Sequence, residues 1–410
     1  MIPKAEILSV AKNQELLANI VEKDYVIGRF LMGIAQHPLL NKLVFKGGTC
    51  LKKCFFETYR FSEDLDFTVP EGSVYDAYSY REALIECTDS ITEETGIQFP
   101  EEGIEIKESH DKENRRTFQG KVSYRGPLQP RSKTLPKIKI DLSKHEVIVE
   151  PPEQRNIQHF YSDRPANLFP ALCYSINEIL AEKTRAIYER AGRARDIYDI
   201  VNIGRNYRED INPQRALTIL REKFKFKSLP IPTVENILAK IDDQIIRANW
   251  EHQLRHQLPV LPPVQSYLEE LRSESLWWME VKPIIVSLPS ISEKPREKSI
   301  PRMPFPEMGH PGIQARTDRD YGTVSYSRNL DLITYAARNR LCVEIGYHGV
   351  DRLVEPYSLR IKNTGHLLLY VHEQRRGYVH SGTIKAFKLA EIEYARVTEK
   401  SYSARYLVEL

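Results

Sequence analysis

The stretch Lys46–Val69, KGGTCLKKCFFETYRFSEDLDFTV, carries the pattern that decides the fold. The apolar run Leu43–Phe45 before it predicts a short buried strand, and Gly47-Gly48 predicts a tight turn where backbone amides can approach a ligand. Thr49 is a suitable N-cap for a short helix over 50–56. Because the first amides of a helix are free to bind anions, we expect an anion-binding turn here.

The second half of this stretch, from Arg60 to Val69, alternates polar and apolar residues like a half-exposed strand. One face would present Ser62, Asp64, Asp66 and Thr68. Two aspartates on one face repel each other unless a cation lies between them, and carboxylate oxygens suit Mg²⁺ that also binds phosphates. A diglycine turn or an Asp-x-Asp pair alone is usually structural. Their combination, one short helix apart, favours a phosphate and metal site.

A third carboxylate comes from the segment Lys137–Ser143, KIKIDLS, which also alternates cleanly. Ile138, Ile140 and Leu142 would face a core, whereas Asp141 would lie on the opposite face with the lysines. Alone, this segment is typical of an ordinary half-exposed strand. In a sheet that already presents two aspartates, Asp141 would complete a two-metal site.

Residues 176–203 predict two amphipathic helices, with Gly192 either ending the first helix or joining it to the second. Lys183 falls within the apolar stripe, where a lysine can either extend to solvent or reach a ligand phosphate. The spacing does not decide between these alternatives. Asp196 and Asp199, three residues apart, would lie on one side of the second helix.

These segments together resemble the AbiEii/AbiGii-type nucleotidyltransferase toxins of the polymerase-β-like superfamily. The resemblance rests on FKGGTCLKKCFF followed by RFSEDLDF, on the Glu22–Tyr25 segment EKDY, and on Lys183 followed by Arg195–Asp199, RDIYD. It implies a mixed sheet flanked by helices. It also implies transfer of a nucleoside monophosphate (NMP) from a nucleoside triphosphate (NTP) to an acceptor hydroxyl.

The resemblance also assigns roles to residues. Two Mg²⁺ ions would be held by Asp64, Asp66 and Asp141, and Lys183 would act with them in catalysis. The nucleotide would be bound by Gly47, Gly48, Thr49, Lys52, Ser62, Lys183, Arg195 and Asp196. The biology implied is a toxin or phage-defence component that modifies RNA, such as the 3′ end of tRNA, together with a cognate antitoxin. Two alternatives stay open: a protein or small-molecule acceptor, and an effector-sensing or nucleic-acid-binding regulator with an inactive transferase lobe.

Composition and length limit the kind of protein that this chain can be. The chain has 410 residues and a net charge of +3, so two or three domains are expected and no strongly basic nucleic-acid binder is indicated. Five scattered cysteines favour a reducing compartment, and we interpret Cys50 and Cys54 as half-buried packing residues rather than zinc ligands. No long apolar run or signal peptide is evident, so we expect a cytoplasmic protein without membrane contact.

The remaining segments before residue 287 are predicted to be mainly helical. Two amphipathic helices are expected over 3–36, with EKDY on a solvated face, and another over Val74–Thr95. Residues 205–286 predict further helices broken by prolines, in which Trp250, Trp277 and Trp278 are core or domain-contact residues rather than base-stacking platforms.

The composition changes again near the C-terminal end. Residues 287–317 are proline-rich and predict a linker between a nucleotidyltransferase domain (1–286, helical from about 170) and a second domain (318–410). The second domain predicts a helix and then strands that form a small β-barrel or strongly bent sheet. ARNRLCVEIGYHGVDRLVEPYSL, GHLLLYVHE, GTIKAFKLAEIE and SARYLVEL resemble a WYL regulatory domain, although the naming tripeptide is replaced by His366-Leu367-Leu368. Its candidate effector-binding residues are Arg352, Tyr357, Arg360 and Lys385, for which ordinary surface charge is the alternative. The fold class is therefore α+β.

Overall fold

The computed structural model describes residues 1–56, 59–110, 114–129, 134–190, 192–280, 301, 303, 328–361 and 366–410. The chain divides into two compact units, Met1–Lys282 and Pro283–Leu410. The linker expected over 287–317 lies outside the described residues, apart from residues 301 and 303. Within the described residues, no helix combines the length and apolar character needed to cross a membrane.

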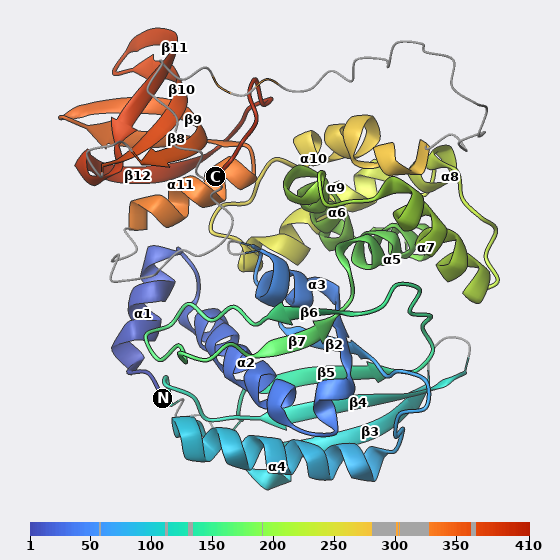
Figure 1. Ribbon diagram of the computed structural model, residues 1–410. Coiled ribbons are helices and arrows are strands. Elements are labelled where there is room, and N and C mark those ends of the chain that lie inside the picture. The colour runs from blue at the N-terminus through green and yellow to red at the C-terminus, as the bar shows by residue number, and fades with distance from the viewer. Residues whose placement is uncertain are drawn as a thin grey trace. The chain divides into compact units, whose positions relative to one another are not determined.

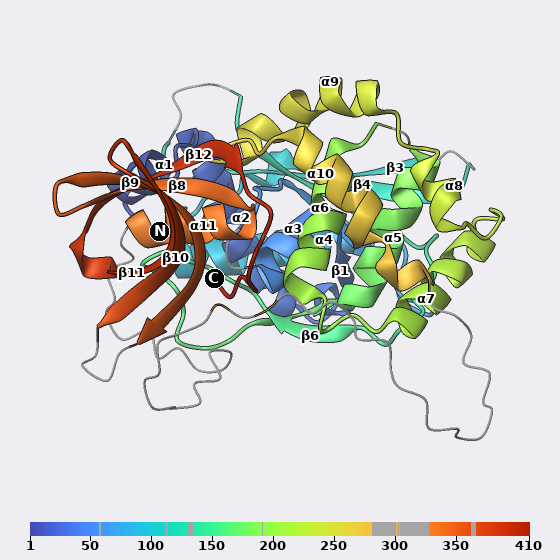
Figure 2. The same cartoon turned by 90° about the horizontal axis from the view of Figure 1, so that it is seen from above.

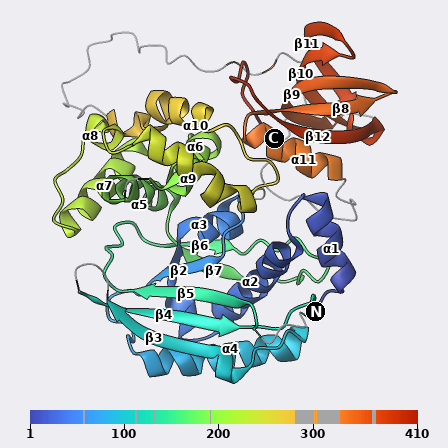
Figure 3. The ribbon, with the colours of Figure 1, turned by 180° about the vertical axis from the view of Figure 1, so that it is seen from behind.

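The first unit contains a seven-stranded mixed sheet in the order β3-β4-β5-β2-β1-β7-β6 (Figures 1 and 3). The pairs β2–β5 and β1–β7 are parallel, and the other neighbours are antiparallel. The predicted strand Lys137–Ser143 is confirmed without change as β5. The strands are β1 (Val44–Lys46), β2 (Asp64–Thr68), β3 (Ile104–His110), β4 (Arg116–Ser123), β5 (Lys137–Ser143), β6 (Glu153–Asn156) and β7 (Pro170–Cys173).

The alternation of β2 places its apolar side chains in the core. Leu65 and Phe67 are buried, and the Phe67 ring stacks on that of Phe45 in β1 with centroids 5.0 Å apart. A one-residue shift of register would move this apolar set to the other face, so burial fixes the register of β2. The polar side chains of β2 consequently lie on the opposite face, which carries the candidate site.

Among the described residues, the sheet half of the unit contains the α-helices α1 (Lys4–Asn13), α2 (Ala18–Gln36), α3 (Gly47–Cys50) and α4 (Ala77–Thr95). Helix α4 packs along β3 and begins three residues later than predicted, because the Asp76 side chain accepts a hydrogen bond from the Ser79 amide as an N-cap. The solvated face predicted for EKDY is wrong. Glu22 accepts a hydrogen bond from the Leu128 amide, and Asp24 pairs with Lys53, so both carboxylates are buried among partners distant in sequence.

The helical half follows β7 (Figure 2). Helices α5 and α6 pack against each other. Helix α5 ends at Glu189, with Arg190 as its C-cap, so Gly192 joins the two helices rather than ending the first. Its φ of +86° is one that only glycine adopts easily. Trp250 and Trp278 are buried, as expected for core residues, and Trp277 is half-buried. The helices are α5 (Ile176–Glu189), α6 (Ala194–Tyr207), α7 (Pro213–Phe226), α8 (Val234–Leu238), α9 (Asp243–Leu254) and α10 (Val264–Glu270).

The second unit is a five-stranded antiparallel sheet in the order β11-β10-β9-β8-β12, with α11 packed on β8 and β12. Among the described residues the edge strands β11 and β12 are not paired, so the sheet is open. The barrel alternative is therefore not observed, and Figure 1 shows strongly curved strands. The elements are α11 (Arg328–Arg338), β8 (Leu341–Tyr347), β9 (Val350–Ile361), β10 (Leu367–Arg376), β11 (Val379–Lys388) and β12 (Ile392–Ser401).

Candidate functional site: three carboxylates beside a diglycine turn

The sheet places the three predicted carboxylates on one face. Asp64 and Asp66 lie two residues apart on β2 and therefore share one face. In the parallel pair β2–β5, Asp66 is directly opposite Asp141 and Asp64 is opposite Lys139. Asp141 thus lies on the same face as the other two aspartates, although 75 residues separate it from Asp66 (141 − 66).

The pKa values of these groups report their crowding. The pKa of Asp66 is raised to about 6, mainly by burial and also by the negative charge of Asp141, against the opposing effect of the ammonium groups of Lys46 and Lys183. Burial and the charge of Asp64 likewise raise the pKa of Asp141. Two half-buried carboxylates that both resist ionisation form a site in which a bound cation relieves the repulsion. The donor set therefore fits a hard divalent ion such as Mg²⁺.

The diglycine turn has the geometry that only glycine permits. Gly47 has φ +79°, and a Cβ atom on it would lie 2.4 Å from Asp66 Oδ2. A Cβ atom on Gly48 would lie 2.4 Å from Arg60 Nη2 and 3.1 Å from Ser62 Oγ. The turn therefore contacts the acidic strand directly, and Ser62, which precedes β2, lies beside the turn.

Thr49 does not have the predicted capping role. Helix α3 (Gly47–Cys50) begins at Gly47 and continues into a π-helical turn over Leu51–Phe55, so Thr49 lies inside the helix. Its buried hydroxyl donates a hydrogen bond of 2.6 Å to the Asp64 carbonyl oxygen. The side chain thus ties the helix to β2.

Lys183 is held by the two aspartates of the RDIYD segment. Its Nζ lies 2.8 Å from Asp196 Oδ1 and 2.8 Å from Asp199 Oδ2. Burial disfavours the charged ammonium, but the two carboxylates raise the pKa of Lys183 above its ordinary value. Asp199 also accepts hydrogen bonds from Arg60 Nε and Nη2 at 2.7 and 2.8 Å, and Arg60 Nη1 donates to Gln257 at 2.8 Å. Lys183 is therefore a half-buried charged residue whose field reaches Asp66.

Two other predicted nucleotide-binding residues, Lys52 and Arg195, come from different elements, the π-helical turn and α6. Lys52 is buried, with its ammonium 4.8 Å from the centre of the Phe61 ring. Arg195 is half-buried near the start of α6.

Sequence reasoning missed three charged residues close to the carboxylates. Lys46, the last residue of β1, is opposite Asp66 in the antiparallel pair, and its Nζ lies 2.7 Å from Glu182 Oε1. Arg193, exposed just before α6, interacts electrostatically with Asp66. A lysine that ends an apolar strand was the available signal for Lys46, whereas nothing in the local sequence indicated Glu182 or Arg193.

A sheet that presents aspartates beside a diglycine turn, with lysines in reach, has the arrangement that the sequence predicts for a nucleotidyltransferase. A family model described as nucleotidyl transferase AbiEii toxin, type IV TA system, matches residues 29–272, more than half of the chain. The protein belongs to this family of toxin–antitoxin nucleotidyltransferases.

Comparison with solved structures gives a match to MenT4, a nucleotidyltransferase toxin from Mycobacterium tuberculosis H37Rv. The two chains are 18% identical with a TM-score of 0.48, and the match covers 69% of this chain and 91% of MenT4. None of the curated protein sequences matches this chain.

The four candidate effector residues of the second unit are not equivalent. Arg352 and Tyr357 are buried: Arg352 Nη1 lies 2.6 Å from Glu373 Oε1, and the Tyr357 hydroxyl donates to Glu355 at 2.8 Å. Arg360 pairs with Glu409, and Lys385 is exposed on β11. Surface charge, the alternative considered, therefore describes Lys385 but not Arg352 or Tyr357.

Proposed function

We propose that the enzyme transfers a nucleoside monophosphate from an NTP to RNA in an Mg²⁺-dependent reaction, with the 3′ end of tRNA as its acceptor. The observation that carries this proposal is the register of β2 and β5, which opposes Asp66 to Asp141 on the face that also carries Asp64. Three carboxylates on one face match a reaction in which two divalent ions bind a triphosphate.

In the proposed reaction, the acceptor oxygen forms a bond to the α-phosphorus as the bond from that phosphorus to the bridging oxygen breaks, and pyrophosphate leaves. Asp64, Asp66 and Asp141 would hold two Mg²⁺ ions, which neutralise triphosphate charge and polarise the attacking hydroxyl. One of these carboxylates accepts the acceptor proton.

The other proposed contacts follow from position and charge. The backbone at Gly47 and Gly48 can approach the β and γ phosphates because neither residue has a Cβ atom. Lys183 and Lys46 both act electrostatically on Asp66 and would lower the cost of bringing the triphosphate there. Ser62, beside the turn, and Lys52, Arg195 and Asp196 remain candidates for ordering the nucleotide. Thr49 contributes through its backbone only.

In a cell, the proposed role is that of a toxin in a type IV system, held in check by a cognate antitoxin and serving in phage defence. The reaction would take place in the cytoplasm, where NTPs and tRNA occur. The domain division proposed is a transferase domain (1–286), a linker (287–317) and a WYL-like regulatory domain (318–410). In that domain Lys385 and Arg360 are better candidates for effector contact than the buried Arg352 and Tyr357.

The test is incorporation of label from each of the four NTPs into total cellular RNA by the wild-type enzyme and by Asp66→Ala. We expect wild-type incorporation at the 3′ end of tRNA, and none with Asp66→Ala. The exposed carboxylate Asp89 on α4 provides a control, since Asp89→Asn should retain full incorporation. Label in protein or in small molecules would reject RNA as the acceptor, and normal incorporation by Asp66→Ala would reject the site.

A further inference from the structure

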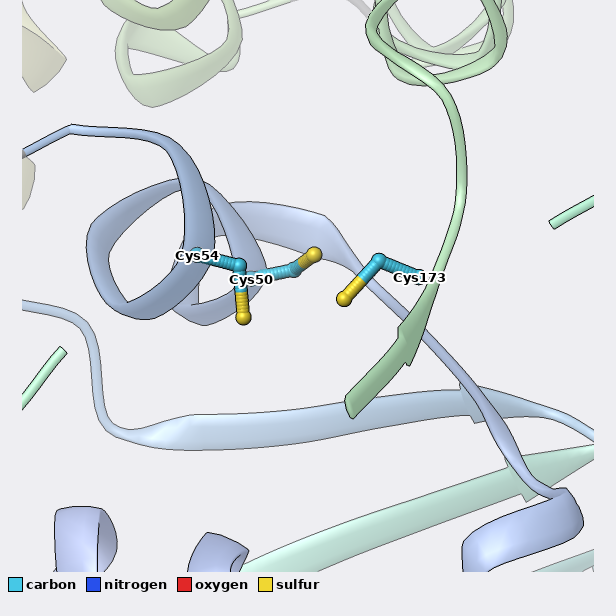
Figure 4. Close-up of side chains that lie close together, drawn as sticks. All are labelled: Cys50, Cys54 and Cys173. Carbon is cyan, nitrogen blue, oxygen red and sulfur yellow. The ribbon is translucent and has the colours of Figure 1, made fainter. Parts of the chain in front are cut away.

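Three of the five cysteines meet inside the first unit. Cys50 lies on α3, Cys54 in the π-helical turn and Cys173 at the end of β7, and their sulfur atoms all lie within 4.8 Å of one another (Figure 4). All three are free thiols and are buried. We call this group the cysteine triad. The sequence did not reveal it because Cys173 is far from the other two along the chain.

The main chain fixes the positions of the three cysteines. Phe45 in β1 is opposite Cys173 in the parallel pair β1–β7, and the Tyr174 amide donates a hydrogen bond of 3.0 Å to the Phe45 carbonyl oxygen. Helix α3 begins directly after β1, so its residues pass close to the end of β7. Cys50 and Cys54 are four residues apart and therefore lie on one face of that helical segment. Ordered main-chain elements thus hold all three sulfurs.

The spacing of the sulfurs suits a metal ion. Sulfurs bound to a tetrahedral zinc ion at about 2.3 Å are about 3.8 Å apart, so the triad needs to contract by at most about 1 Å. Lys53 and Arg155 supply positive charge near the sulfurs. Hydrogen bonds from Cys173 and Cys50, together with these two cations, lower the pKa of Cys54 to about 5. The pKa values of Cys50 and Cys173 are raised instead, by burial and by the neighbouring sulfurs. Cys54 is therefore the thiolate of the group, and a thiolate is the form that binds metals.

We propose that the cysteine triad binds one thiophilic cation, Zn²⁺ or Cu⁺, which joins the helix that follows the diglycine turn to strand β7. Binding forms three metal–sulfur bonds and releases to solvent the protons that the thiols still carry, with no change of oxidation state. Three thiolates can complete the coordination of Cu⁺, whereas Zn²⁺ takes one further ligand. Within the described residues, no histidine or carboxylate completes the group.

This site differs in chemistry from the carboxylate site. Thiolates select soft cations, and the oxygen ligands of Asp64, Asp66 and Asp141 select hard ones. Excess Mg²⁺ therefore should not displace an ion from the triad. Loss of nucleotidyl transfer would leave this inference untouched, and absence of the bound cation would leave the proposed reaction untouched.

The experiment uses the full chain, stripped of metal by a chelator under anaerobic conditions and kept in excess Mg²⁺. Zn²⁺ is added in one arm and Cu⁺ in the other, and the bound ion is counted after gel filtration. We expect one ion per chain in at least one arm, with three sulfur neighbours by X-ray absorption spectroscopy. No retained ion in either arm, or an ion bound by oxygen and nitrogen alone, would overturn the proposal.

Two matched sets of variants locate the ion. Cys54→Ser and Cys173→Ser should each lower the retained metal at least tenfold, whereas Cys87→Ser and Cys342→Ser, at buried cysteines outside the triad, should retain it. Equal retention by all four variants would also overturn the proposal.

A measurement on the wild type covers the case in which the triad variants do not fold. Alkylation followed by mass spectrometry should show that the added ion slows modification of Cys50, Cys54 and Cys173 and leaves the rates at Cys87 and Cys342 unchanged. Uniform rates with and without the ion would count against the triad.

Discussion

A Cβ atom on Gly47 would lie 2.4 Å from Asp66 Oδ2, so the turn and the acidic strand leave no space between them for a side chain. The glycine is therefore required twice, once for its φ of +79° and once for the carboxylate beside it. This contact allows the two requirements to be separated by experiment.

Gly47→Ala should abolish nucleotide incorporation and destabilise the fold by more than left-handed strain alone, which costs about 1–2 kcal/mol. Gly72 provides the control, because it has the same φ of +79° and no atom within 4 Å of an added Cβ. Gly72→Ala should therefore show the strain without the collision and should keep its activity. Urea unfolding and incorporation assays measure both effects. Equal losses of stability in the two variants would show that Asp66 moves aside freely.

The raised pKa of Asp66, about 6, sets a pH dependence. A carboxyl group whose pKa is higher in the folded than in the unfolded state contributes stability at low pH, and this contribution is lost as the pH rises through the folded-state value. Without divalent ions, the free energy of unfolding should therefore fall between about pH 4 and pH 6. Asp66→Asn should remove this component, and Mg²⁺ should stabilise the wild type more at pH 7 than at pH 5. Chemical denaturation across this range, with and without Mg²⁺, measures it.

Lys183 has a structural and a proposed catalytic role, and two variants distinguish them. Lys183→Met leaves the buried carboxylates of Asp196 and Asp199 without its ammonium, which should cost about 3–5 kcal/mol. Adding Asp196→Asn removes one excess charge while Arg60 still pairs with Asp199, so stability should partly return. Activity should stay absent in the double variant if the ammonium assists the triphosphate. Recovery of activity together with stability would make Lys183 a purely structural residue.

In the second unit, the predicted effector residues should respond differently. Arg352→Ala leaves Glu373 buried without its guanidinium partner, and we expect a local loss of about 3 kcal/mol. Lys385→Ala, on the exposed face of β11, should change local stability by less than about 0.5 kcal/mol. Amide hydrogen exchange in β9, β10 and β11 reports this difference without requiring a known effector. Unchanged exchange rates in Arg352→Ala would return that residue to the effector candidates.

The candidate carboxylates could be predicted because strand alternation is local. Lys137–Ser143 emerged as β5 without change, and its pattern alone assigned Asp141 to the polar face. Which strand β5 pairs with, and in which register, depends on long-range packing. The alignment of Asp66 with Asp141 was therefore an expectation that only the sheet could test.

The partners of buried charges could not be predicted in the same way. Glu22 and Asp24 look solvated in the sequence because the groups that satisfy them, the Leu128 amide and Lys53, lie far along the chain. Glu182 and Cys173 were missed for the same reason. A charge pattern shows how many charged groups a helix carries, but not which distant group compensates each one.

The Asp199 carboxylate has a consequence for how the first unit can be divided. It comes from α6, yet it satisfies Arg60, which leads into β2, and Gln257 from beyond α9 completes the same guanidinium. A fragment that ended before α5 would retain every proposed metal ligand. It would lack Asp199 and Gln257, so the buried Arg60 guanidinium would lose both of these partners. The strands that carry the aspartates and the helices from α5 onward therefore depend on each other for folding. We expect that a fragment without these helices cannot serve as a minimal enzyme.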